Sequence, residues 1–302
     1  MTTPWKEALD NATKSDLWLA GVGCFAHVFG VGKTGYVVKK SLEPFVVKDL
    51  QPGEKHIYER LGQHPFILRY YGEYQNSTEP SNGVPSGLVF EYVSGGVLVE
   101  KLALSEYSEQ RTAWPVQAAE AIHYIHSKNI IHSDIGCHNF LLKEDGTLIL
   151  ADFGGSMIDD ENPTVCYATR YRRPLPPGKT YDDSDTATIT DDLFALGTLI
   201  YEVTVGHRLY PDQNSRDIRV LINERKFPNI DALPSRIQTV IRKCWDEKYE
   251  SADEVLHDLQ DQHVSGVGYS ASNIICPYSI GLCAAILTIA FILAKWNQRK
   301  IL

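Results

Sequence analysis

The sequence predicts an α+β fold of two segregated lobes: a small antiparallel β-sheet lobe with one main helix, and a larger, mostly helical lobe. A C-terminal transmembrane helix is predicted to follow them. Residues 17–48, 67–74 and 88–93 are rich in β-branched and aromatic residues and are separated by Gly-, Pro- and Asn-containing turns, which is typical of strands. After Gly95 and Gly96 the apolar residues recur at helical spacing. Because strands precede helices, the pattern favours two lobes over alternating βαβ units.

The predicted elements follow one another along the chain. Residues 1–15 form a polar N-terminal arm, which is either a short helix or a loose segment. The main helix of the first lobe covers 53–62, where Ile57, Tyr58 and Leu61 share one face and a glycine ends the helix. The helices of the second lobe are predicted at 114–127, 191–205, 207–225, 233–245 and 252–260.

The C-terminal segment has a different character. Residues 274–294 are 21 uncharged, mostly apolar residues, which as a helix would span roughly 30 Å, the thickness of a bilayer core. A buried core helix is the alternative, although such helices rarely run so long without a charge. Residues 263–273 would then be a linker and 295–302 a short basic tail.

The predicted span implies a single-pass tail anchor. The first residues contain no apolar signal region, so we expect residues 1–270 to face the cytosol. The basic tail opposes this orientation, because positive charges usually stay on the cytosolic side. The mitochondrial outer membrane and the endoplasmic reticulum remain equally good candidates for the membrane.

The composition limits the classes of partner. The chain has 302 residues and a formal net charge of −9, so we expect no nucleic-acid partner, since phosphates would be repelled. Its six cysteines show no metal-ligand spacing. We read them as free thiols in a reducing compartment.

A glycine-rich segment lies near the first predicted strands, where Gly21, Val22 and Gly23 are followed by Ala26 and Val28. Glycines let backbone N–H groups approach phosphate oxygens without an intervening side chain. Taken alone, the segment is explained equally well as an ordinary hairpin turn.

A lysine and a carboxylate stand fifteen residues apart. Lys39 ends a strand-like run, and Glu54 lies on the predicted helix. Lys40 and Lys48 are neighbouring candidates, but the spacing to Glu54 and to the glycine-rich segment favours Lys39. Each charge taken singly would be read as an exposed surface group.

Two short polar motifs follow in the second lobe. His132-Ser133-Asp134 precedes Asn139 by a few residues, and Asp152 begins an Asp-Phe-Gly sequence thirteen residues beyond Asn139. A turn that uses Asp and Asn for backbone contacts would explain the first motif. It would not explain the spacing to the second.

In this order the motifs resemble the signature of the eukaryotic-type protein kinase superfamily. The chain is similar to a divergent, fungal-type kinase domain with a C-terminal transmembrane segment. The resemblance covers about residues 16–262 and implies an N-lobe over 16–90, a hinge over 91–94 and a C-lobe over 95–262.

The resemblance implies ATP and magnesium as ligands and assigns roles to named residues. Asp134 would take the proton of the acceptor, and the ion pair of Lys39 with Glu54 would hold the α- and β-phosphates. Asn139 and Asp152 would bind magnesium. The further ATP-binding positions would be Gly21, Val22, Gly23, Ala26, Val28, Glu91, Val93 and Leu141.

Three scaffold residues have expected roles as well. Phe90 would be a bulky gatekeeper at the rear of the adenine site. Phe153 would pack near Tyr58 and His132, and Asp192 would tie down the backbone of the catalytic loop. These roles are implied by the resemblance alone.

The chain departs from the family at several positions. Ser133 replaces an arginine that commonly binds a phosphorylated activation loop, so we expect activity without phosphate on Thr164, Tyr167 or Thr169. Gly136 stands where Ser/Thr kinases usually carry a lysine, and Cys137 and His138 complete the loop.

A further departure concerns an ion pair. The family's Ala-Pro-Glu sequence is replaced by Arg172-Arg173-Pro174-Leu175, and the matching arginine near the end of the domain is replaced by Glu250. We therefore predict a charge-reversed pair between Arg172 or Arg173 and Glu250. The alternative is that the bridge is lost altogether.

These observations predict an ATP-dependent protein kinase, anchored to a membrane through residues 274–294, with a protein substrate and with Ser or Thr favoured over Tyr. Loss of the loop lysine would slow transfer. The alternative is a membrane-tethered pseudokinase or nucleotide-binding scaffold. A small-molecule kinase is a third reading, disfavoured by the complete helical lobe.

Overall fold

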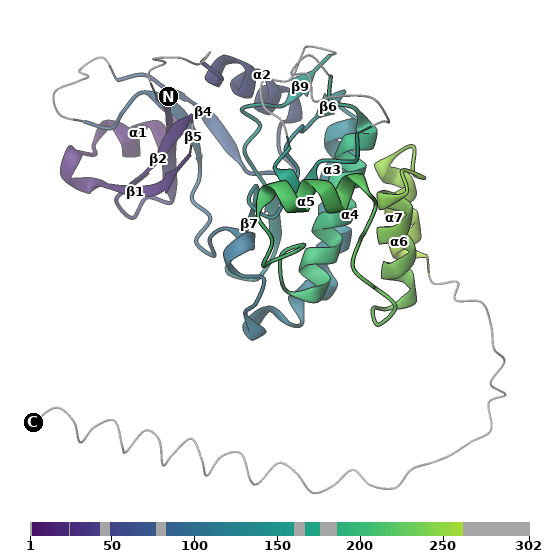
Figure 1. Ribbon diagram of the computed structural model, residues 1–302. Coiled ribbons are helices and arrows are strands. Elements are labelled where there is room, and N and C mark those ends of the chain that lie inside the picture. Colours follow the sequence, from purple (N-terminus) through teal and green to yellow (C-terminus); the bar gives the residue numbers. More distant parts are fainter. Residues whose placement is uncertain are drawn as a thin grey trace, which may run out of the picture. The chain divides into compact units, whose positions relative to one another are not determined.

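The computed structural model (Figure 1) describes residues 2–23, 25–42, 49–76, 83–159, 167–175 and 186–261. Met1–Asp261 forms one compact unit. The predicted linker, transmembrane segment and basic tail, residues 263–302, lie outside the described residues. Within the ranges that the structure describes, no helix is long and apolar enough to cross a bilayer.

The first lobe is built on a five-stranded antiparallel sheet with the order β1-β2-β3-β5-β4. Its strands confirm the predicted β-rich region. Gly32 and Gly35, with φ of +52° and +78°, form the turn between β2 and β3, a conformation that side chains disfavour. The strand bounds are β1 Leu17–Val22, β2 Ala26–Val31, β3 Tyr36–Ser41, β4 Tyr70–Tyr74 and β5 Gly87–Glu91.

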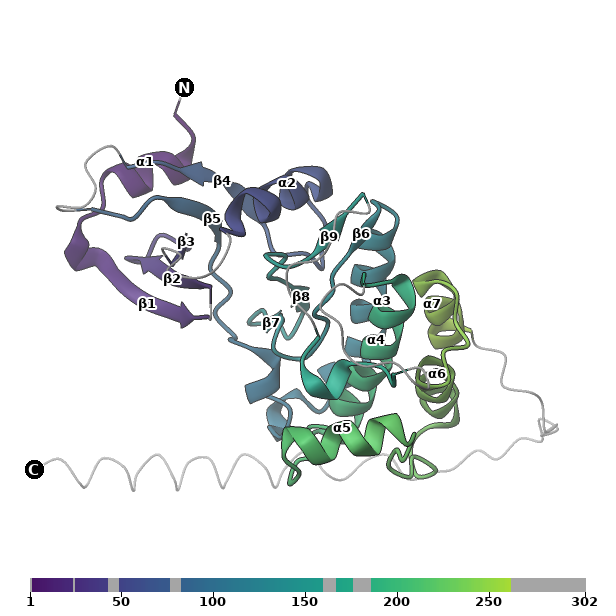
Figure 2. The ribbon, with the colours of Figure 1, turned by 45° about the horizontal axis from the view of Figure 1, so that its top comes forward.

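Each face of this sheet packs against a helix. Alternation along β3 sends Val37 into the main core, which it shares with Ile57 of α2 (Gln51–Leu61). Val38 points the other way, into a second cluster with Leu9 of α1 (Pro4–Asp10). Figure 2 shows both helices beside the strands. The N-terminal arm therefore contains the short helix, and that helix covers apolar sheet surface.

The second lobe is mainly helical, as predicted. One predicted helix is much shorter than expected: α5 begins only after Asn214, whose side chain accepts the N–H groups of Arg216 and Asp217 and so caps the helix. The helices are α3 Trp114–His126, α4 Ile189–Val205, α5 Ser215–Asn223, α6 Ser235–Trp245 and α7 Ala252–Gln260. Short 3-10 helices occur at Lys14–Asp16, Leu98–Glu100, Ser105–Tyr107, Gln110–Thr112 and Thr169–Tyr171.

Two small two-stranded sheets lie between the helices and the site, and only one of them is a hairpin. β7 (Phe140–Leu142) pairs with β8 (Leu148–Leu150), and β6 (Ile130–Ile131) pairs with β9 (Met157–Ile158). The buried indole of Trp114 donates to the carbonyl of Gly146 at 2.9 Å. This bond ties the β7–β8 turn to the start of α3.

The predicted charge-reversed ion pair has a different carboxylate partner. Arg173 lies 2.5 Å from Asp191 through Nε and 3.2 Å from Glu247 through Nη1. The prediction of Glu250 is therefore wrong for Arg173. Glu247 follows the end of α6 with a φ of +57° and carries the contact, whereas the backbone N–H of Glu250 donates to Glu254 at 3.1 Å.

Candidate active site

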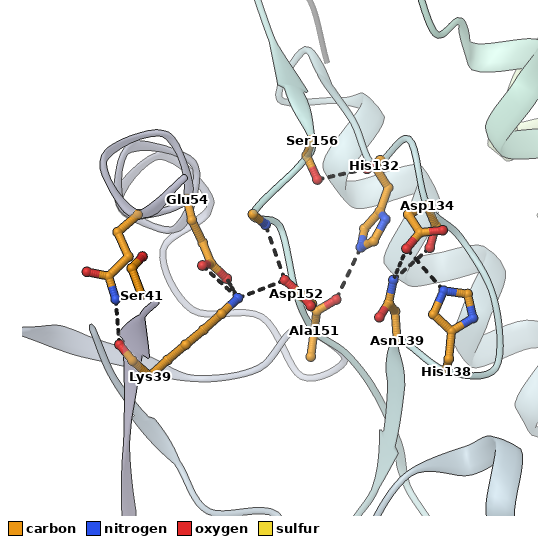
Figure 3. A network of polar contacts seen from close by, with 12 residues as sticks. Lys39, Ser41, Glu54, His132, Asp134, His138, Asn139, Ala151, Asp152 and Ser156 are labelled. Atoms are coloured by element: carbon orange, nitrogen blue, oxygen red, sulfur yellow. Dashed lines mark hydrogen bonds and ion pairs between the residues drawn. The ribbon is translucent and has the colours of Figure 1, made fainter. Parts of the chain in front are cut away.

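A lysine shared by two carboxylates forms one half of the site (Figure 3). Lys39 on β3 lies 2.8 Å from Glu54 of α2 and 2.7 Å from Asp152. Glu54 is buried, with 2% of its side chain exposed. The predicted Lys39–Glu54 pair is confirmed, and so is the choice of Lys39 as the lysine that forms it.

Lys39 and Asp152 stabilise each other's charge, whereas burial opposes the charge of Glu54. Burial alone would lower the pKa of Lys39, but the attraction of Glu54 and Asp152 outweighs it and raises that pKa. Desolvation would raise the pKa of Asp152, but Lys39 holds it below its ordinary value. Burial raises the pKa of Glu54 against the opposing effect of Lys39. At neutral pH the site therefore presents a lysine cation beside the Asp152 anion.

Local packing fixes the position of Asp152. The residue follows β8 with a φ of +61°, and the next side chain, Phe153, is fully buried. The Phe153 ring lies 5.1 Å from the ring of Tyr58 and 4.9 Å from that of His132, as predicted. Because these rings anchor Phe153, the carboxylate of Asp152 is held toward Lys39.

The second half of the site is the loop after β6. The buried carboxylate of Asp192 accepts the backbone N–H groups of His132 at 2.8 Å and Ser133 at 3.1 Å, which confirms its predicted role. Burial would raise the pKa of Asp192, but the contact with His126 and other neighbours outweighs burial and lowers that pKa. The anion stabilises Ser133, whose φ of +67° is costly for a residue with a side chain.

Asp134 is held at several points within this loop. The Nδ2 group of Asn139 donates to the carbonyl of Asp134 at 2.8 Å and to its Oδ2 at 3.0 Å. The backbone N–H of Ala168 donates to Oδ1 at 3.2 Å. His138 lies 3.1 Å from Oδ2. The structure thus joins Asp134 and Asn139, both predicted, to His138, for which the sequence pattern predicted no role.

The described residues fit magnesium in one particular way. Asn139 uses its Nδ2 group on Asp134, which leaves its amide oxygen as the possible ligand. Asp152 uses Oδ1 on Lys39 while its side chain stays 56% exposed. Among the residues the structure describes, no three His, Cys, Asp or Glu side chains gather into a metal site. Mg²⁺ suits such a site, because it is commonly bound by one or two protein oxygens while phosphates and water complete its coordination shell.

The predicted ATP-binding residues lie on the strands and connections around these charges. Gly21 and Val22 end β1, and the N–H of Gly23 donates to the carbonyl of Ala26 at 2.9 Å, which closes the turn into β2. Val93 is buried in the main core, and Val28 and Leu141 pack against it. Glu91 ends β5. The roles of these residues toward ATP stay predictions.

The rear of this region is filled by aromatic rings. Phe90 is 3% exposed, and its ring lies 4.9 Å from that of Tyr58 and 5.5 Å from that of Tyr70. Val37, which was not among the predicted site residues, belongs to the same core. Its position two residues before Lys39 on the same face of β3 was the available signal.

Two tyrosines that follow the Asp-Phe-Gly segment stabilise the loop that carries Asp134. The Tyr167 hydroxyl donates to Asp192 at 2.5 Å, and the Tyr171 hydroxyl donates to Glu202 at 2.5 Å while accepting the N–H of Cys137 at 3.0 Å. Both side chains are buried. Tyr167, named above as a possible phosphorylation site, therefore has a structural contact here, whereas Thr164 lies outside the described residues.

Comparison with known proteins finds relatives of this chain. The chain is 36% identical to Aurora kinase A-A of Xenopus laevis over 176 residues, 56% of this chain and 39% of that protein. It is 30% identical to Aurora kinase of Dictyostelium discoideum over 216 residues (66% and 52%), and 28% identical to cAMP-dependent protein kinase type 3 of Saccharomyces cerevisiae over 221 residues (69% and 52%). It thus spans 39–52% of the length of these relatives. The family model described as "Protein kinase domain" matches residues 15–258, well over half of the chain, and the chain therefore belongs to the protein kinase domain family.

Proposed function

We propose that this chain is an ATP-dependent protein kinase that transfers the γ-phosphate to a protein hydroxyl, with Ser and Thr favoured over Tyr. One observation carries the proposal. Lys39 is charged and positioned by both Glu54 and Asp152, while Asp134 and Asn139 are locked together in the adjoining loop. A scaffold without activity would not need to keep both halves in order.

Each residue has a task in the transfer. Lys39 holds the α- and β-phosphates, and Glu54 keeps the lysine in place. Asp134 orients the acceptor hydroxyl and takes its proton as the hydroxyl oxygen bonds to the γ-phosphorus and the bond to ADP breaks. Asn139 and Asp152 would hold magnesium, which when bound neutralises charge on the phosphates.

The competing proposal is a nucleotide-binding pseudokinase or scaffold, and Ser133 and Gly136 are the observations that favour it. The purified full-length chain with Mg-ATP and a peptide array of Ser, Thr and Tyr acceptors tests both. We expect D134N to bind nucleotide without transferring phosphate, and K39A to lose binding. Nucleotide binding by the wild-type chain without any transfer would favour the scaffold, and the labelled acceptors would settle Ser or Thr against Tyr.

The membrane anchor is part of this proposal and rests on the sequence of residues 274–294. A tail anchor would place the kinase lobes in the cytosol, where ATP is available, on either the mitochondrial outer membrane or the endoplasmic reticulum. Protease added to intact organelles should then digest the kinase lobes. Protection of those lobes would rule out this topology. Recovery of the full-length chain in the soluble fraction, apart from membranes, would rule out the anchor.

A further inference from the structure

The imidazole of His138 contacts Asp134, and none of the roles assigned above accounts for this contact. Its Nε2 lies 3.1 Å from Asp134 Oδ2, and the two side chains are 31% and 23% exposed. Figure 3 shows the ring beside the carboxylate, on the side away from Lys39. His138 therefore touches the group that must receive the acceptor's proton.

Gly136 makes room for this ring. A Cβ atom built on Gly136 would lie 2.5 Å from Cε1 and 2.7 Å from Nδ1 of His138, and 2.7 Å from Cε2 of Tyr171. Real Cβ contacts are not this short, so a side chain at residue 136 and the present position of the His138 ring exclude one another. The absence of a side chain at residue 136 and the presence of the ring are a single structural feature.

A buried tyrosine packs beside the His138 ring. The His138 ring lies 5.7 Å from that of Tyr171. Tyr171 is fully buried, and its hydroxyl is held by Glu202 and by the N–H of Cys137. Because the Tyr171 hydroxyl is hydrogen-bonded on both sides, the ring against which His138 packs is held in place by the scaffold.

The hydrogen bonds of Asp134 show what the contact achieves. A carboxylate oxygen offers about two lone-pair directions. Oδ2 meets both His138 and Asn139, whereas Oδ1 meets the N–H of Ala168. Among the contacts of the residues that the structure describes, the second lone pair of Oδ1 is therefore the one left for an acceptor hydroxyl.

We propose that His138 is a positioning residue for phosphoryl transfer, an inference that rests on the proposed kinase function. As an Nε2–H donor it fixes Oδ2 of Asp134, so that Oδ1 faces the acceptor hydroxyl. The proton passes to Oδ1 as the hydroxyl oxygen bonds to the γ-phosphorus and the bond from phosphorus to ADP breaks. His138 keeps its own proton throughout, and its space is the one that a side chain at residue 136 would take.

The test compares two amides at residue 138 in the purified full-length chain, with Mg-ATP and the best peptide from the array. In H138Q the amide nitrogen reaches as far as Nε2, whereas in H138N it falls short. We expect H138A and H138N to lower kcat by about tenfold, as the loss of one hydrogen bond to a charged group would, with KM for ATP within about twofold. H138Q should keep kcat within about threefold of wild type. H123A, on the exposed surface of α3, is the matched control and should behave as wild type.

The possible outcomes separate the inference from the proposed function. Wild-type kcat in H138A would overturn the positioning role. Equal losses of kcat in H138Q and H138N would overturn it too, because the hydrogen bond of the amide nitrogen to Asp134 would then not matter. An increase in KM for ATP without a change in kcat would overturn it too. If the wild-type chain binds nucleotide but transfers nothing, the proposed function itself fails, and the inference fails with it. If H138A does not fold, the comparison of H138Q with H138N still decides.

Discussion

Replacing Arg173 by Ala should destabilise the helical lobe. The guanidinium joins the segment before Pro174 to Asp191 at the start of α4 and to Glu247 after α6. Arg225 lies 2.5 Å from the other oxygen of Glu247. The four side chains thus form a line of alternating charges, and Arg173 is the member that holds two separate elements together.

The size of the effect follows from the geometry. A hydrogen bond to a charged group contributes about 1.5–3 kcal/mol, and an exposed ion pair about 0–1 kcal/mol. Arg173 is 30% exposed, Asp191 15% and Glu247 22%. We therefore expect R173A to lower the free energy of unfolding by about 2 kcal/mol, which is a fall in Tm of about 4–8 °C in a domain of this size. E247A should cost about 1 kcal/mol, because Arg173 keeps Asp191.

Urea unfolding of wild type, R173A, E247A and the double variant measures the coupling between the two residues, which should be about 1 kcal/mol. The exchange R173E/E247R is the sharper experiment. In an isolated pair it would restore stability, but here it would place like charges beside Asp191 and Arg225, so we expect no rescue. Full rescue, or a coupling near zero, would refute the proposed network.

Three further predictions concern the site. Y167F removes the bond to Asp192 and should lower kcat about three- to tenfold, while mass spectrometry of active wild-type protein should find no phosphate on Tyr167. The folded-state pKa of Asp192 is lowered, so its contribution is complete above the unfolded pKa of about 4 and is lost as the pH falls through the folded value. Urea unfolding between pH 3 and 7 should therefore show a flatter acid limb for D192N than for wild type. F90A should lower the free energy of unfolding by about 3–5 kcal/mol, and a thermal melt within 3 °C of wild type would contradict the aromatic packing described above.

The sequence predicted those features that short, local patterns encode. The spacing of Lys39 and Glu54 predicted an ion pair that the structure confirms, since one residue lies on a strand and the other on the helix that follows. The boundary of α5 was missed because the capping side chain of Asn214 outweighed the apolar spacing around it. The apolar spacing alone started this helix at residue 207, whereas it begins at Ser215.

Contacts between distant segments escaped prediction unless the family resemblance implied them, as it did for Asp192 and Phe153. The bond from Tyr167 to Asp192 joins residues that are far apart in the sequence, and no local pattern marks either one as the other's partner. Glu247 was missed in favour of Glu250 because counting residues from Trp245 takes no account of the left-handed backbone at Glu247. The contact of His138 with Asp134 was not predicted either, because it depends on the space that Gly136 leaves for the His138 ring.

The packing of α1 sets the size of the smallest fragment that should be well behaved in solution. The family match runs from residue 15 to residue 258, so a protein trimmed to those limits would lack Leu9 and Leu259, which are 1% and 4% exposed. Loss of Leu9 would bare the face of the sheet that carries Val38 and Val89, and bare apolar sheet surface promotes self-association. A fragment for crystallisation or inhibitor screening should therefore include α1 and all of α7, although the usual family limits leave α1 out.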